Sequence, residues 1–167
     1  METLFETRYV RNKEIAKEFF GFYYFKRKGI LFWYVFMLLL FVLDVIAVIC
    51  DDVYSLYILI IVPFFFLIQI WSYFRQVRLM TTRDCESHGG EITVETIVTD
   101  EGIQCTSSNG GVYKVEYDKV KKAIKTKNLI ILQTKAKVAY LLPKDAFTKG
   151  SAEEFIAFLK AKGIKIK

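Results

Sequence analysis

Histidine, cysteine and proline are scarce in this chain of 167 residues. It contains one histidine, three cysteines and two prolines, together with nine glycines. An odd number of cysteines without paired spacing gives no disulfide framework, and so few prolines and glycines exclude a collagen-like chain. A hydrophobic content of 53% excludes a disordered acidic tail. Since 25% of the residues are charged, the apolar excess must be concentrated in particular segments.

Two long runs hold most of the apolar residues. Residues 30–50 contain a single charged residue, Asp44, and residues 53–74 contain none and are interrupted at Pro63 and Gln69. A helix needs about 20 apolar residues to cross a bilayer, and neither run has a polar face at helical spacing. A buried pair of soluble helices and a cleavable signal peptide both fit less well. The sequence therefore predicts a transmembrane hairpin of two helices.

The charges around these runs predict its orientation. Residues 1–29 contain seven basic and four acidic residues, and residues 75–167 contain seventeen basic and eleven acidic residues. The runs and their short link contain three acidic residues and no basic one. Aromatic residues gather at the inner boundary: Phe22, Tyr23, Tyr24, Phe25, Trp33, Tyr34, Trp71 and Tyr73. By the positive-inside rule, we expect a two-span protein of the cell membrane with both termini in the cytoplasm.

After the second run, the sequence predicts a basic helical linker over residues 75–88 and a folded cytoplasmic domain over residues 89–167. In that domain apolar and polar residues alternate with a period of two, which is typical of half-buried strands. The pair Asn109-Gly110 predicts a tight hairpin. Tyr113 and Val115 are expected to face inward on the strand that follows.

Both ends of the chain carry further signals. Ser151-Ala152-Glu153-Glu154 has the pattern of a capping box that begins a C-terminal helix, and Gly163 suits its end. The cytoplasmic segment 1–29 reads as a strand, Leu4 to Val10, followed by an amphipathic helix. We expect this first strand to join the C-terminal sheet.

Several segments carry a family resemblance: Asp100-Glu101-Gly102-Ile103, Asn128-Leu129-Ile130-Ile131-Leu132, Ala139-Tyr140-Leu141-Leu142-Pro143-Lys144-Asp145-Ala146-Phe147 and Ser151-Ala152-Glu153-Glu154-Phe155. They resemble the YcxB-like family of small bacterial membrane proteins, and the two preceding spans match that family's layout. The resemblance implies an α+β membrane protein in which a C-terminal antiparallel sheet is capped by one helix, as in pleckstrin-homology-like domains. It implies no catalytic residues.

The residues themselves offer little for catalysis. Cys85-x-x-His88 could supply two zinc ligands, but no second pair completes a set of four. A nucleophilic site that needs a histidine would have to use this same His88. We therefore expect no metal, no cofactor and no enzyme activity.

Two polar residues inside the spans are candidate intramembrane contacts, Asp44 and Gln69. A carboxyl group at the centre of a span costs on the order of 2–3 kcal/mol, and less near the interface. Asp44 either reaches the interface, contacts a partner helix or ion, or bonds across the hairpin to Tyr54, Ser55 or Tyr57. For Gln69, Tyr34 is the expected partner.

The basic residues beyond the second span have two interpretations, an ordinary solvated face or contact with anionic lipid. Near a leaflet each Lys or Arg contributes about 1 kcal/mol. The candidate leaflet contacts are Arg75, Arg78, Lys121, Lys122 and Lys125. No arginine occurs from residue 89 onward, and nucleic-acid readers favour arginine, so we expect no nucleic-acid partner.

These observations predict a non-catalytic, membrane-anchored interaction protein. Some bacterial membrane proteins with pleckstrin-like domains give resistance to bacteriocins, so the resemblance implies an immunity protein that neutralises a membrane-acting toxin or bacteriocin. The alternative is a scaffold or regulator that binds lipids of the inner leaflet. An enzyme or transporter would need a larger assembly around Asp44. An oligomer of this chain is a further alternative.

Overall fold

The computed structural model describes residues 2–50, 56–88 and 91–167, with backbone alone for residues 28, 56–59 and 83–88. The chain divides into two compact units. Residues 1–19 and 80–167 form one, here called the sheet unit, and residues 20–79 form the other, the helical unit.

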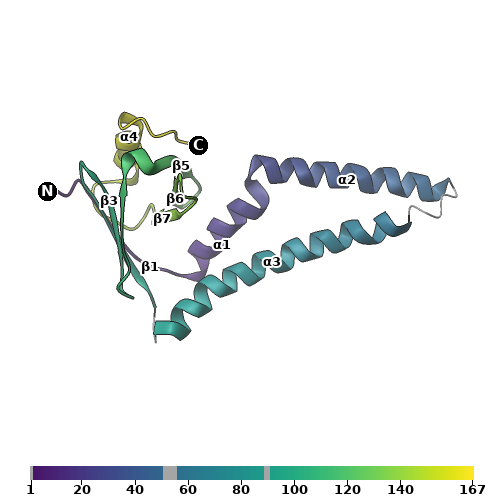
Figure 1. Cartoon of the computed structure of the whole chain (residues 1–167), viewed down its shortest axis with the longest axis horizontal. Helices are drawn as coiled ribbons and strands as arrows, with labels where there is room; N and C mark the ends of the chain where they lie inside the picture. The colour runs from purple at the N-terminus through teal and green to yellow at the C-terminus, as the bar shows by residue number, and fades with distance from the viewer. Residues whose placement is uncertain (1, 51–55, 89–90) are drawn as a thin grey trace. The chain divides into compact units, whose positions relative to one another are not determined.

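The helical unit is built around α2 (Lys28–Ile49) and α3 (Leu56–His88), which follow α1 (Lys13–Gly21) and the π-helical turn η1 (Phe22–Lys26). The two long helices lie side by side (Figure 1), and the rings of Tyr34 and Phe66 join them at 5.5 Å. Apolar side chains are exposed all around α2. Such a helix is normally covered by a protein core or by lipid.

Both long helices are therefore long and apolar enough to cross a membrane, over residues 29–49 and 60–82. Pro63 lies inside α3, which continues on both sides of it. The helix extends to His88, so the whole of the segment 75–88 is helical. The expected Asp51-Asp52 link lies outside the described residues.

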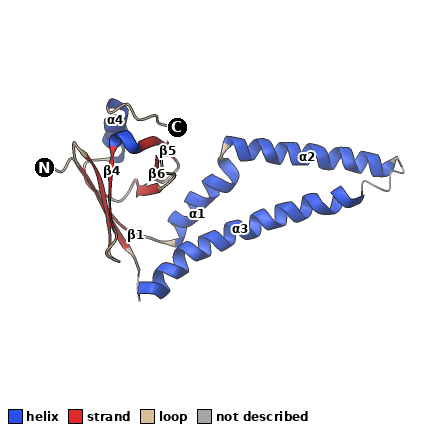
Figure 2. Ribbon diagram, viewed as in Figure 1, coloured by secondary structure: helices blue, strands red, loops and turns tan. Residues whose placement is uncertain are grey.

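The sheet unit contains two antiparallel sheets and the helix α4 (Ala152–Ala161), together with most of α1 and the end of α3 (Figure 2). The first sheet has the order β4-β3-β2-β1-β8, with bounds Val112–Glu116, Gly102–Ser107, Thr93–Val98, Phe5–Val10 and Phe147–Lys149. The second has the order β5-β6-β7, with bounds Val120–Lys125, Leu129–Thr134 and Ala139–Pro143. The helix α4 follows them. The predicted α+β organisation, with C-terminal antiparallel sheets ending in a helix, is confirmed.

The first strand joins the sheet, as expected. All six residues of β1 pair with β2 in antiparallel register, from Phe5 opposite Val98 to Val10 opposite Thr93. On its other side β1 pairs with β8, a short strand that the sequence did not predict. Strand β1 is therefore an interior strand of the larger sheet, although the helical unit separates it from β2 in the chain.

The core of the sheet unit lies between the sheets and α4. Phe155 and Leu159 of α4 are fully buried beside Val98 and Leu142 from the two sheets. The predicted capping box forms, since Ser151 Oγ accepts from the Glu154 amide and Glu154 accepts from the Ser151 amide. The apolar stripe predicted for this helix is therefore the face that closes the core.

Two turn glycines have the conformation that the sequence predicts, but one side chain does not. Gly110 has φ +86° in the β3–β4 hairpin, and Gly163 has φ +77° after α4. The inward placement expected for Tyr113 is wrong, because its side chain is 58% exposed while Val115 is buried. Tyr113 lies on the edge strand β4 opposite Cys105, beyond the part of the sheet that the core covers.

Candidate functional site

Asp44 is a buried carboxyl group inside an apolar helix. It is 5% exposed, and its Oδ2 atom has no hydrogen-bond partner within the described part of the chain. The partners expected across the hairpin were Tyr54, Ser55 and Tyr57, whose side chains lie outside the described residues. A buried polar atom without a partner is uncommon in native structures and calls for an explanation. Asp44 therefore stays a candidate contact.

Gln69 and Tyr34 lie close together but do not bond to each other. Both line an apolar hollow of about 380 Å³ with Phe25 and Phe66. The Tyr34 hydroxyl donates instead to the carbonyl oxygen of Tyr24, at 2.8 Å. The expected hydrogen bond between Tyr34 and Gln69 is therefore not formed, because the turn η1 presents a closer acceptor.

Three of the aromatic residues predicted at the inner boundary, Tyr24, Phe25 and Tyr73, form a cluster that fixes η1 against α3. The ring of Tyr73 lies 6.2 Å from the ring of Tyr24 and 5.3 Å from that of Phe25. The hydroxyl groups of Tyr24 and Ser72 are 3.0 Å apart and hydrogen-bonded. These contacts join α3 to η1, the turn from which the chain enters α2.

The basic candidates occupy both units. Arg75 and Arg78 are exposed on α3, and the Arg75 guanidinium lies 5.4 Å from the centre of the Trp71 ring. In the sheet unit, Lys121 and Lys125 are exposed on β5, whereas Lys122 is half-buried. The candidates therefore form one group on α3 and another on β5.

The C-terminal tail adds lysines to the group on β5. The amide of Ala123 donates to the carbonyl of Lys165, and the amide of Lys125 donates to that of Lys167. The tail thus continues the smaller sheet, with Ile166 paired in parallel to Ala123. Lys165 and Lys167 lie beside the β5 lysines, which the sequence pattern did not predict.

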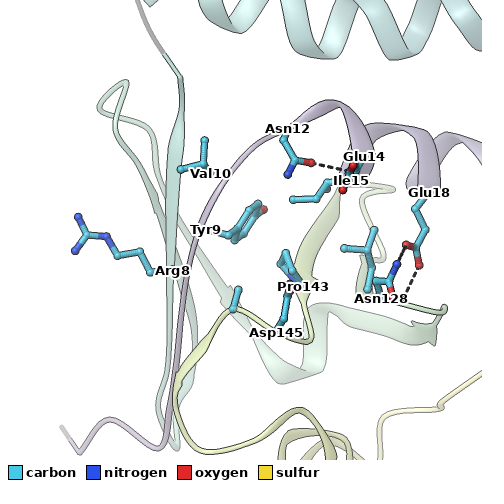
Figure 3. A pocket seen from close by; sticks show the side chains of 12 residues that line it. Arg8, Tyr9, Val10, Asn12, Glu14, Ile15, Glu18, Asn128, Pro143 and Asp145 are labelled. Carbon is cyan, nitrogen blue, oxygen red and sulfur yellow. Dashed lines mark hydrogen bonds between the residues drawn. The ribbon is translucent and has the colours of Figure 1, made fainter.

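A second hollow of about 380 Å³ lies in the sheet unit between β1, α1 and the end of β7. Figure 3 shows Asn12 at the start of α1, where its Oδ1 accepts from the Ile15 amide at 2.9 Å. Arg8 points away from Tyr9 and the hollow, while Glu18 points toward Asn128. The walls are mixed polar and apolar, with carboxyl groups contributed by Glu14, Glu18 and Asp145.

Glu18 fastens α1 to the β5–β6 turn. Its Oε1 accepts from the Thr126 hydroxyl at 2.5 Å and from the Asn128 amide at 2.8 Å, and its Oε2 accepts from Asn128 Nδ2 at 3.0 Å. Burial raises the pKa of this carboxyl group, but these hydrogen bonds outweigh it and hold the pKa below its ordinary value. Because both of its carboxylate oxygens accept hydrogen bonds from this turn, Glu18 has a structural role.

The same turn is held from the other side by Lys144. Its Nζ donates to the carbonyl oxygens of Thr126 and Lys127, at 2.5 and 2.7 Å. Pro143 ends β7, and Lys144, the next residue, holds the β5–β6 turn. Sequence reasoning missed Glu18 and this role of Lys144, because their partners lie 108 and 18 residues away along the chain.

Two further groups have shifted acidities for structural reasons. Burial raises the pKa of Tyr117 to about 12, with the Asp100 charge adding to the effect. Its hydroxyl donates to the Thr99 carbonyl at 2.5 Å. Burial also raises the pKa of the Cys105 thiol, which accepts from Thr96 Oγ1 at 3.7 Å. Neither arrangement produces a reactive nucleophile.

Among the residues whose side chains are described, no group of three or more His, Cys, Asp or Glu could hold a metal ion. The side chains of Cys85 and His88 lie outside that set. Cys50 and Cys105 are free thiols.

The model of the YcxB-like protein family matches residues 98–159, from the end of β2 to α4. No curated protein and no solved structure matches the chain. The matched residues contain all the segments quoted above for the resemblance. Over residues 98–159 the chain is therefore similar to the YcxB-like family, which agrees with the resemblance seen in its sequence.

Proposed function

We propose that the two apolar helices cross the cytoplasmic membrane as a hairpin and hold the sheet unit at its cytoplasmic face. The pairing of β1 with β2 supports this topology. One strand precedes the helices and the other follows them, so both ends of the helical segment must be on the same side of the membrane. Two apolar helices satisfy this condition with two crossings. The basic flanks favour the cytoplasmic side.

We propose a pleckstrin-homology-like fold for the sheet unit. Strands β1 to β4 pair successively in one antiparallel sheet, β5 to β7 form a second, and α4 closes the core between them. In this arrangement the membrane hairpin occupies the connection between the first two strands. The similarity supports an interaction domain and does not by itself indicate a ligand.

For the function, we propose a non-catalytic interaction protein that neutralises a membrane-acting toxin or bacteriocin by contact within the bilayer. The observation that carries this proposal is Asp44, a buried carboxyl group in an apolar helix, whose Oδ2 has no hydrogen-bond partner among the residues with described side chains. Ionisable groups inside membranes are costly and often mark functional contacts. A polar group of the toxin would supply the missing hydrogen bond.

The test is a membrane-integrity assay in cells exposed to a toxin encoded beside the gene. Membrane potential is followed by dye in cells with the wild-type chain, with Asp44→Asn, and with no copy of the gene. We expect the wild-type chain to prevent depolarisation and Asp44→Asn to lose this protection. Leu43→Ala is the matched control, because Leu43 is the exposed neighbour of Asp44. Equal depolarisation with and without the wild-type chain would exclude that toxin as the target.

A second function is favoured by the lysines on β5 and the tail. The hydrogen bonds of Ala123 and Lys125 bring Lys165 and Lys167 beside the β5 strand. Such a group attracts anionic headgroups, which would make the chain a lipid-binding scaffold or regulator. We expect residues 119–127 to be protected from hydrogen exchange in anionic nanodiscs at low salt. The protection should be lost at high salt and in Lys121→Gln/Lys125→Gln, and its absence at low salt would contradict this function.

A further inference from the structure

Large apolar side chains are rarely exposed in the sheet unit. Among its described residues, those that are exposed are Val10, Val112, Tyr113 and Val138. The first three lie near one end of the five-stranded sheet, at the end of β1 and the beginning of β4. We call Val10 together with the segment Ser108–Tyr113 the exit rim.

Strand register brings these residues to the same end of the sheet. Val10 is opposite Thr93, Val112 is opposite Thr106, and the amide of Ser108 donates to the Thr93 carbonyl at 2.9 Å. The chain leaves β1 for α1 and enters β2 from α3 at this end. Both connections to the helical unit therefore start beside the exit rim.

The opposite end of the same sheet, here called the far rim, is acidic. Its carboxyl groups come from the β2–β3 turn and from the segment after β4: Asp100, Glu101, Glu116 and Asp118. Two lysines accompany them, with Lys119 2.9 Å from Glu116 and Lys162 3.9 Å from Asp100.

The exit rim, in contrast, contains no charged side chain. The charges nearest to it in the sequence are Arg11, Glu91 and Lys114, which flank it. Tyr113 turns its ring over Gly111, where a Cβ atom would come within 3.0 Å of the ring. The large exposed apolar side chains of this sheet thus lie at one end and the carboxyl groups of its turns at the other, while Glu95 lies on β2 opposite Thr106.

We propose that the exit rim lies at the headgroup level of the cytoplasmic leaflet, with Tyr113 and Val112 in the bilayer interface and the far rim in water. The inference rests on the membrane anchorage proposed above. Tyrosine is enriched at membrane interfaces because its ring is apolar and its hydroxyl is polar. An anionic leaflet repels carboxylates, which favours the same orientation of the acidic far rim.

The test uses the full chain in vesicles of phosphatidylcholine and phosphatidylglycerol, with or without brominated acyl chains that quench tryptophan. The native tryptophans are Trp33 and Trp71. Single-indole chains carry Tyr113→Trp or Asp118→Trp in a background of Trp33→Phe and Trp71→Phe. A third chain carries only Trp71→Phe, so that Trp33 reports insertion of α2. Val112→Trp gives a second reading from the exit rim if Tyr113→Trp disturbs the hairpin.

We expect brominated lipid to quench Trp33 and the indole at position 113, and the indole at position 118 several-fold less. If Trp33 is quenched while the indoles at positions 113 and 112 are quenched no more than that at 118, the inference is wrong and the anchorage stands. If Trp33 is not quenched, the membrane anchorage itself is wrong. The readout does not depend on any toxin, so the two failures are distinguishable.

Discussion

The two units of this chain place their apolar side chains in opposite ways. In the sheet unit, Phe155, Leu159 and Leu142 are fully buried by the unit's own strands and helix. In the helical unit, Phe32 is 69% exposed and Ile60 is 70% exposed. The sheet unit supplies its own apolar environment, whereas the helical unit needs one from outside. The same physical driving force thus gives a core in one unit and an exposed apolar surface, suited to lipid, in the other.

Removal of a large ring should therefore affect the two units very differently. We expect Phe155→Ala to destabilise the sheet unit by about 3–5 kcal/mol, because it leaves a cavity beside Phe5 and Phe147. Phe32→Ala removes a ring of the same size from an exposed position, so its effect on unfolding of the sheet unit should be close to zero. Denaturant unfolding of both full-length variants in micelles, followed by circular dichroism, measures this difference. Equal destabilisation would show that the two surfaces are not distinct.

Substitution of Asp44 tests whether α2 is inserted in lipid. We expect Asp44→Leu to make membrane insertion of α2 more favourable by about 2 kcal/mol, because an apolar side chain replaces a carboxyl group inside the span. The measurement is the inserted fraction of α2 in a glycosylation-mapping assay. Leu43→Asp is the reverse change at the neighbouring exposed position and should disfavour insertion. An unchanged inserted fraction for both variants would contradict the assignment of α2 as a span.

The two units also differ in how much the sequence predicts. The helical unit follows from long uninterrupted apolar runs, and the strands follow from period-two alternation and from turn residues such as Gly110. These signals are local, and they also predict the capping box at Ser151. A local pattern could indicate that β1 is a strand, but its position between β2 and β8 required the three-dimensional arrangement. A fragment that begins at residue 89 would lack this interior strand.

The sequence indicates which polar residues are candidate site residues, but it does not indicate their hydrogen-bond partners. Asp44 and Gln69 stand out because polar residues are rare in apolar runs, yet the bond expected from Tyr34 to Gln69 goes to the Tyr24 carbonyl. A backbone acceptor offered by a π-helical turn has no sequence signature. The contact of Glu18 with Thr126 joins residues 108 positions apart, and no local pattern encodes it.

Helix capping offers a smaller contrast between the units. Ser151 caps α4, whereas no side chain caps α2 at Arg27. We expect Ser151→Ala to lower the unfolding free energy of the sheet unit by about 1 kcal/mol, and Ser151→Asp to retain most of it, because aspartate also caps helices well. Arg27→Ala should leave that free energy unchanged. The denaturation midpoints of the three variants measure these effects, and a loss in Ser151→Asp equal to that in Ser151→Ala would argue against capping as the cause.

The smallest expected effect concerns Glu18, which lies in the last part of α1 that belongs to the sheet unit. Its pKa in the folded chain is below the ordinary 4.5, because its carboxylate accepts hydrogen bonds from Thr126 and Asn128. A lowered pKa means that the stabilisation is complete above the pKa of the unfolded chain and is lost as the pH falls through that of the folded chain. Since Glu18 is only half-buried and solvent screens its charge, we expect less than about 1 kcal/mol.

The stability of wild type and Glu18→Gln, measured by denaturant titration, should therefore differ most above the pKa of Glu18 in the unfolded chain and converge as the pH falls through the lower pKa of the folded chain. Glu101→Gln is the control, because Glu101 is an exposed carboxyl group in the β2–β3 turn of the same unit. It should show no comparable convergence. If Glu18→Gln were as stable as wild type at neutral pH, the hydrogen bonds of Glu18 would not hold α1 on the sheet unit. The attachment of this helix would then depend on other contacts, among them the burial of Ile15 and Ala16.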